Sequence, residues 1–204
     1  MNYCDPSGHF VLTISALLTG IAIGAAVGAG FAFGATLLAD WHDDGQVFNG
    51  SIGFDQYFGN TLGGAISGAG IGVCGILGVS LGISIVAGET LVVGAATLSG
   101  LATLGISMGA AVGTGALGYS ARVAFNSTED FEWADMFIAA GANAASGLAT
   151  FITSMWRGAL GYKIPGQKTS LHNLMLHQIF LFEKGGYFAK LLIAIFKKYL
   201  QEEY

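Results

Sequence analysis

The sequence predicts an all-α protein with about four membrane-spanning helices, and three observations point to it. Hydrophobic residues make up 53% of the 204 residues and charged residues 10%, whereas soluble domains carry about 25% charged residues. The stretch 56–121 contains one formal charge, Glu89, so no helix within it offers a polar face to water. Several runs have a glycine at every fourth position, which places these glycines on one side of a helix. We therefore expect helices that face lipid and pack together through glycine-lined faces, in the manner of a glycine zipper.

The first expected span covers residues 10–39, which carry no formal charge. At a rise of about 1.5 Å per residue, about 20 residues cross a hydrocarbon core of about 30 Å. Three of its glycines are predicted to pack against another helix: Gly20, Gly24 and Gly28. The acidic run 40–45 follows, with Trp41 expected at the lipid–water boundary. Because its acids do not have the spacing of a calcium-binding loop, we expect a solvated loop rather than a cation site.

The second and third expected spans cover residues 58–87 and 90–120, separated by a short polar break at Gly88 and Glu89. A connection this short usually joins antiparallel neighbours. Each span carries a further glycine triple that is predicted to pack against a helix. These are Gly64, Gly68 and Gly72 in the second span, and Gly105, Gly109 and Gly113 in the third.

Two Gly-x-Gly-x-x-Gly strings occur in the same region, at 70–75 and 113–118. A dinucleotide-binding fold needs a strand before such a string, a helix after it and an acid about 20 residues further on. No acid follows the first string at that distance, and the residues before the second continue the four-residue glycine period of a helix. We therefore expect no cofactor.

The fourth expected span covers residues 136–156. Four of its polar side chains fall on roughly one helical face: Asn143, Ser146, Thr150 and Thr153. Such a face serves either as a hydrogen-bonding seam between helices or as a wetted pore lining. We favour the seam as the simpler explanation and leave the pore lining open.

The region 157–204 differs in kind, because it is basic and amphipathic. In its second half, large apolar residues form one helical stripe, while lysines lie elsewhere around the helix. A helix of this kind lies readily in a membrane interface, with its lysines toward anionic head groups. The lysines expected at the interface are Lys190, Lys197 and Lys198.

Charge is distributed unevenly along the chain. All eight Lys and Arg lie at or after Arg122, so the sequence has no basic patch for phosphates and nucleic acid is not an expected partner. Positive residues prefer the cytoplasmic side of a membrane, which places the basic loop 157–168 inside. Alternation of the spans then places the acidic loops around Asp43 and Glu129 together on the outer side.

The first nine residues, MNYCDPSGH, carry a pattern that is known from one family. The matching residues are Asn2, Tyr3, Asp5, Pro6, Gly8 and His9. With the glycine-rich apolar run that follows, they resemble the end of the core of Rhs-repeat proteins, which are bacterial polymorphic toxins. The resemblance implies that residues 1–9 are a remnant of that core end and that the hydrophobic region, residues 10–156, moves or anchors a toxin at a target membrane. A repeat shell or an immunity protein are the partners that it implies.

The sequence contains no grouping of Ser, His and Asp and no Cys/His metal spacing, so we expect no enzyme. We expect a non-enzymatic membrane-inserting module that anchors, translocates or forms a pore, with the lipid bilayer as partner and self-association through glycine faces. A resident multi-pass membrane protein of structural or transport role is the first alternative, and a small toxin effector in the tail from Lys163 onward is the second. The expected location is a membrane, which for an exported toxin belongs to a target cell.

Overall fold

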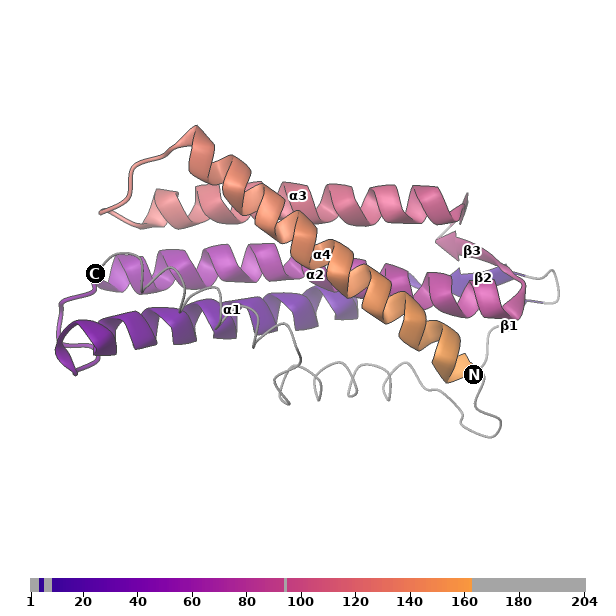
Figure 1. The fold of residues 1–204 in the computed structure, drawn as a ribbon, viewed down its shortest axis with the longest axis horizontal. Helices are drawn as coiled ribbons and strands as arrows, with labels where there is room; N and C mark the ends of the chain where they lie inside the picture. The colour runs from indigo at the N-terminus through magenta and orange to yellow at the C-terminus, as the bar shows by residue number, and fades with distance from the viewer. Residues whose placement is uncertain (1–3, 6–8, 94, 163–204) are drawn as a thin grey trace, which may run out of the picture. The chain divides into compact units, whose positions relative to one another are not determined.

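The computed structural model describes residues 4–5, 9–93 and 95–162, which form four long helices and a small sheet (Figure 1). The helices are α1 (Ile14–Asp44), α2 (Phe54–Ala87), α3 (Gly100–Phe125) and α4 (Trp133–Tyr162). All four are long and apolar enough to cross a membrane, which confirms the predicted all-α class with about four spans. The interface lysines Lys190, Lys197 and Lys198 lie outside the described residues.

The sheet is made of four short strands: β1 (Cys4–Asp5), β2 (His9–Leu12), β3 (Thr90–Val93) and β4 (Ala96–Leu98). Their order in the sheet follows the chain, with β2 and β3 parallel and the other pairs antiparallel. Leu12 and Leu91 are buried, and both β2 and β3 contact α2. The sheet therefore ties the N-terminal segment to the connection between α2 and α3.

The first span is shifted from its predicted position of 10–39. Residues 9–12 pair with β3, so α1 begins only at Ile14, where the Thr13 hydroxyl accepts a hydrogen bond from the Ala16 amide and satisfies a free N–H of the first turn. The helix also continues to Asp44 and ends at Gly45, whose φ of 77° is readily adopted by glycine. The predicted acidic loop is therefore largely helical.

The predicted third span, 90–120, is wrong at its beginning. α2 ends at Ala87 as expected, and Gly88 follows with a φ of 71°. The next residues form the β3–β4 hairpin instead of continuing into a helix, because the sequence Thr-Leu-Val-Val is rich in β-branched side chains that favour strands. α3 begins ten residues later than predicted, after Ser99, whose hydroxyl accepts a hydrogen bond from the Ala102 amide.

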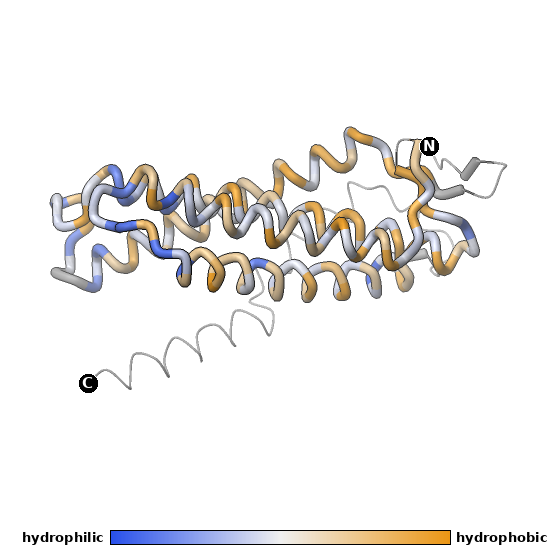
Figure 2. The backbone as a smooth tube through the Cα atoms, turned by 90° about the horizontal axis from the view of Figure 1, so that it is seen from above, coloured by the Kyte–Doolittle hydropathy of each residue, from blue (hydrophilic) through white to orange (hydrophobic). Residues whose placement is uncertain are grey.

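α2 is the central helix of this part of the chain and contacts the other three helices. Helices that follow one another in sequence run antiparallel, whereas α4 runs parallel to α2, with Gly78 against Phe151 and Gly82 against Met155. Figure 1 shows α4 crossing in front of α2. The loops that join α1 to α2 and α3 to α4 lie at one end of the helices, where Figure 2 shows hydrophilic residues gathered. The sheet lies at the opposite end.

Candidate membrane-spanning core

α1 and α2 meet through the six glycines predicted to pack in the first two spans. A Cβ atom built on Gly24 would lie 2.3 Å from the carbonyl oxygen of Gly68, and one built on Gly28 would lie 2.2 Å from that of Gly64. Gly20 and Gly72 make the third approach, since a Cβ built on Gly72 would lie 2.1 Å from the carbonyl oxygen of Gly20. Real Cβ atoms do not come within 3.0 Å of such an oxygen, so the two backbones lie in direct contact.

The third predicted triple does not take part in such a contact. No described atom lies within 4 Å of a Cβ built on Gly105, Gly109 or Gly113. α3 instead buries a second set of mostly small residues, which has the same four-residue spacing: Thr103, Ser107, Ala111 and Gly115. Because two residues of a helix turn about 200°, this face lies opposite the predicted one.

The polar residues predicted to share one face of α4 separate in the structure. Asn143 is buried, and its Nδ2 donates to the carbonyl oxygen of Ala111 at 2.7 Å and lies 3.1–3.2 Å from Thr114 Oγ1 and the Ser67 carbonyl oxygen. Thr153 is exposed and donates to the Ala149 carbonyl of its own helix. Of these four residues, Asn143 is the one for which the structure records hydrogen bonds to other helices. These bonds join α4 to α2 and α3.

Several buried hydroxyl groups of α2 and α3 are satisfied within their own helix, whereas the buried Thr61 Oγ1 on α2 has no hydrogen-bond partner among the described residues. Ser84, Thr103 and Ser107 each donate to the carbonyl oxygen four residues earlier in the same helix. The thiol of Cys74 on α2 donates to the Ser107 carbonyl oxygen on α3 at 3.2 Å. Satisfied backbone and hydroxyl groups are what an apolar surrounding requires, since an unpaired polar group costs several kcal/mol in hydrocarbon (~4 or more).

Asp40, in the last turns of α1, is fully buried rather than solvated as predicted. Its carboxylate accepts hydrogen bonds from the Phe48 amide at 2.8 Å, from the Tyr57 hydroxyl at 2.6 Å and from the Ser51 hydroxyl. The carboxylate therefore folds the α1–α2 loop back onto both helices. In the sequence, the signal for this buried carboxylate is an acidic residue directly after a long apolar run. The same pattern is equally typical of the start of a solvated loop.

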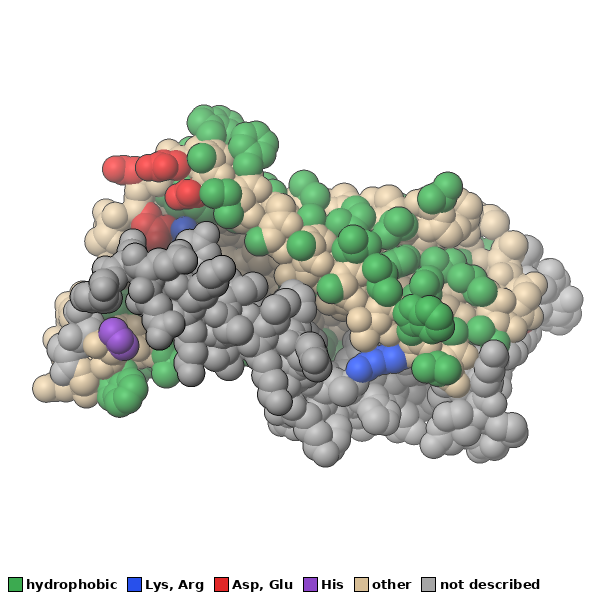
Figure 3. All heavy atoms as spheres, viewed as in Figure 1, with side chains coloured by type: hydrophobic (Ala, Val, Ile, Leu, Met, Phe, Trp, Pro, Cys, Tyr) green, Lys and Arg blue, Asp and Glu red, His purple; other side chains and the backbone are tan. Residues whose placement is uncertain are grey.

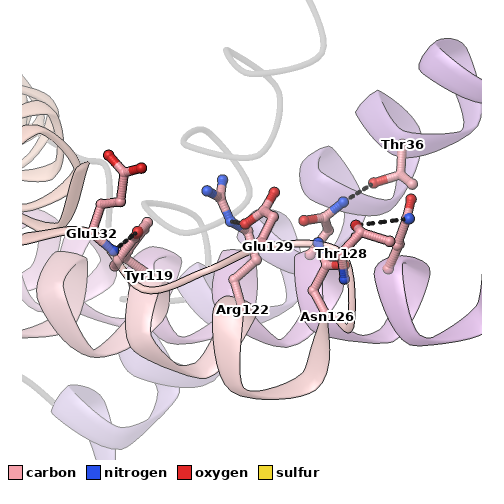
Figure 4. Close-up of polar contacts among 9 residues, drawn as sticks. Thr36, Tyr119, Arg122, Asn126, Thr128, Glu129 and Glu132 are labelled. Carbon is pink, nitrogen blue, oxygen red and sulfur yellow. Dashed lines mark hydrogen bonds and ion pairs between the residues drawn. The ribbon is translucent and has the colours of Figure 1, made fainter.

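The α3–α4 loop is joined to the first turn of α2 and to the last turn of α3 by polar contacts, some of which are drawn in Figure 4. Asp55 accepts hydrogen bonds from the amide and the hydroxyl of Ser127, and Gln56 donates to Thr128 at 3.0 Å. Arg122 and Glu129 form a half-exposed ion pair at 2.9 Å. The structure thus brings the two acidic loops to one side of the helices, as the alternation of spans predicts.

Aromatic side chains surround the same end. Phe33, Phe48 and Tyr57 contact one another, and Phe131 contacts both Tyr119 and Trp133. Trp41, predicted to lie at the lipid–water boundary, is 59% exposed near the end of α1. Aromatic rings beside polar groups are typical of membrane–water interfaces.

The outer surface of the helices is apolar. Large apolar side chains that are more than half exposed include Ile14, Leu18, Phe31 and Leu38 on α1, Phe54 and Ile85 on α2, Leu101 and Leu117 on α3, and Phe137, Ile138, Trp156 and Leu160 on α4. Figure 3 shows hydrophobic side chains spread over the face formed by α3 and α4, with acidic side chains near one end. Many large apolar residues thus face outward while glycines and other small residues lie at the close contacts between helices, as in helices that pack in lipid.

Neither glycine-rich string has the context of a nucleotide site, because residues 70–75 lie inside α2 and residues 113–118 inside α3. Among the described residues no group of three or more His, Cys, Asp or Glu side chains could hold a metal ion. No family model matches the chain, and comparisons with curated proteins and with solved structures find no match.

Proposed function

We propose that this chain is a non-enzymatic membrane-inserting module that anchors itself in a lipid bilayer. The observation that carries the proposal is the distribution of side-chain size, with large apolar side chains exposed on α1, α3 and α4 and small residues at the contacts between helices. Helices in lipid gain little from hiding leucine or phenylalanine from one another and associate through close packing of small residues instead. In water the same surface would leave an exposed apolar area far larger than the few hundred Å2 of ordinary monomers (roughly 300–600 Å2).

The close contacts favour an anchor or carrier over a pore within one copy of the chain. At Gly24, Gly68 and Gly82 the neighbouring backbone lies nearer than a side chain would allow, so no lumen passes between these helices at those levels. The polar side chain of Asn143 is engaged by three oxygen atoms of α2 and α3. A pore would therefore require several copies to assemble around a shared axis.

The Rhs-like origin is part of the proposal and is supported by the sequence resemblance of residues 1–9. The described residues of that segment form β1 and the start of β2, which pair with each other and with β3. The resembling segment is thus attached to the helical part through the sheet. In such a toxin the module would hold or carry an effector at the membrane of a target cell.

Liposome flotation tests the anchoring role. Purified chain, exchanged from detergent into vesicles of mixed zwitterionic and anionic lipid, is expected to float with the vesicles and to resist extraction by high salt and carbonate. A dye-loaded batch reports leakage at the same time, and flotation without leakage is the result expected of an anchor. Leakage that rises steeply with protein concentration would favour an assembled pore, and a folded, monodisperse chain in water without detergent would contradict the proposal.

A charge placed on the outer face provides a sharper version of this test. Leu148 lies near the middle of the apolar face of α4 and is exposed, so Leu148→Lys is expected to weaken insertion by roughly 2–4 kcal/mol. The matched control is Asp130→Lys, which introduces the same lysine at an exposed position in the α3–α4 loop. Equal flotation of the two variants would show that α4 does not face lipid.

A further inference from the structure

α4 carries a tryptophan at each end, and both are exposed. Trp133 is the first residue of the helix and is 66% exposed, whereas Trp156 is 63% exposed one turn and a half before the end. At about 1.5 Å per residue the two rings are attached about 35 Å apart along the helix axis. A hydrocarbon core is about 30 Å thick, so a modest tilt of α4 places one ring at each of its two boundaries.

A charged residue accompanies each tryptophan, and the residues between these two charges, Asp135 and Arg157, are uncharged. Asp135 lies in the first turn of α4 and Arg157 directly after Trp156, while residues 136–156 contain no charge. The exposed side chains of this interval include Phe137, Ile138, Leu148 and Ile152. The helix therefore presents an apolar band that is closed at either end by an aromatic ring and an ionisable group, the arrangement that fixes a helix at a defined depth.

The other outer helices show a band of similar height. On α3, residues 100–121 carry no charge and Arg122 follows at the end that bears the acidic loops. On α1, Trp41 lies at that same end, 27 residues after Ile14. Phe48 and Phe54 in the α1–α2 connection and in the first turn of α2 add two more exposed rings there, at 65% and 83%.

We infer that the protein contacts the head-group–acyl boundary of both leaflets at two defined levels. The ring of Trp41 and that of Trp133 lie at the boundary beside the acidic loops, and the ring of Trp156 lies at the boundary of the opposite leaflet. The partner is a bilayer with a hydrocarbon core of about 30 Å. This inference rests on the proposed membrane anchoring and adds to it the depth and the direction in which the helices cross.

The three tryptophans of the chain permit a direct test by fluorescence. Three full-length variants each keep one tryptophan and carry phenylalanine at the other two positions, for example W41F/W133F for Trp156. In phosphatidylcholine–phosphatidylglycerol vesicles, each ring is expected to lose more fluorescence with lipids brominated near the head group than with lipids brominated near the chain end. Iodide added outside the vesicles is expected to quench the fluorescence of Trp41 and of Trp133 to the same extent. It is expected to quench the fluorescence of Trp156 to a different extent.

Single-cysteine variants give a second measurement that does not depend on the tryptophans. In a background with C4S and C74S, Asp130→Cys marks the acidic loops and Thr97→Cys marks β4, and both positions are exposed. A membrane-impermeant maleimide added outside is expected to label one of these positions and to label the other only after the vesicles are opened with detergent.

The outcomes separate the two proposals. Failure of the wild-type chain to float would overturn the anchoring function and this inference with it. Flotation with all three tryptophans equally open to iodide and both cysteines labelled outside would overturn the inference alone, since the chain would then lie on one leaflet. Strongest quenching of Trp156 by bromines at the chain ends would likewise overturn it.

Discussion

The two faces of α3 have the same spacing of small residues and different surroundings. Gly105, Gly109 and Gly113 meet no described atom, whereas the face that includes Ser107, Ala111 and Gly115 is buried against α2 and α4. The buried face differs in offering hydrogen-bonding groups: the Ala111 carbonyl accepts from Asn143, and the Ser107 carbonyl accepts from Cys74. Spacing makes close approach feasible, and on the buried face it is accompanied by hydrogen bonds from polar side chains of the neighbouring helices.

Two glycines on opposite faces of α3 test this comparison most strongly. A Cβ at position 115 would lie 2.7 Å from Asn143 Cβ and 2.9 Å from two backbone atoms of α4, so Gly115→Ala is expected to reduce the free energy of unfolding by about 1–3 kcal/mol. Gly113→Ala enters open space and is expected to be neutral or to gain up to about 1 kcal/mol from helix propensity. Circular dichroism during detergent-induced unfolding in mixed micelles measures both. Equal losses for the two variants would contradict the assignment of faces.

The next expected effect concerns the hydrogen bonds of the buried face. Asn143→Ala removes the donor that reaches Ala111 and Thr114 and is expected to cost about 1 kcal/mol in a membrane-like solvent. The control is Thr153→Val on the exposed face of the same helix, where the hydroxyl bonds only within α4 and a change below about 0.5 kcal/mol is expected. A double-mutant cycle of Asn143→Ala with Thr114→Val measures the coupling, and a coupling of zero would show that the bond does not join the helices.

A local effect is expected at the buried carboxylate of α1. Asp40→Asn keeps the shape of the side chain and weakens its bonds to the Phe48 amide and the Tyr57 hydroxyl, because a neutral amide is a poorer acceptor than a carboxylate. Hydrogen exchange of the Phe48 amide is expected to accelerate while exchange in the middle of α2 is unchanged. Asp130→Asn at an exposed position of the other loop serves as the control. Unchanged protection of Phe48 in the Asp40 variant would show that the carboxylate does not hold the loop.

The smallest effect is expected at the ion pair that is open to water. Arg122 and Glu129 are 39% and 36% exposed, so Glu129→Gln is expected to change the free energy of unfolding by less than about 1 kcal/mol. The difference from wild type should also shrink when salt is added, because salt screens exposed charges. Unfolding curves at low and high salt check this, and a larger loss that is independent of salt would place the pair in a drier setting than its exposure indicates.

Much of the helical fold follows from the sequence alone. The number of long helices follows from the uncharged runs, because backbone groups in lipid must be satisfied within each segment. The residues at which the helices begin and end are predicted less well from the sequence. The uniformly apolar run predicts a helix that includes residues 90–98, whereas the local β-branched residues Thr90, Val92 and Val93 form a strand.

The contacts between helices follow from the sequence only in part. The glycine triples of the first two spans lie in the contact between α1 and α2, yet the third triple has equal spacing and no described neighbour. The sequence marks Asn143 as a polar residue within an apolar span, but its three partner oxygens come from α2 and α3, and their positions depend on the packing of three helices at once. The acidic run 40–45 predicts a solvated loop because it lacks the spacing of a calcium-binding loop, whereas the groups that donate to the buried Asp40 carboxylate lie 8 to 17 residues further along the chain.

The parallel pairing of β2 with β3 bears on how the chain assembles. His9 pairs with Thr90, about 80 residues further along the chain. Closing so long a loop is slow, because the chain loses conformational entropy before the contacts between the strands stabilise it. The residues between the two strands form α1 and α2, and the antiparallel pairing of these helices brings both strands to one end of the pair. We therefore expect α1 and α2 to pair before β2 and β3 do, so that the small sheet joins the two ends of a helical pair that has already formed.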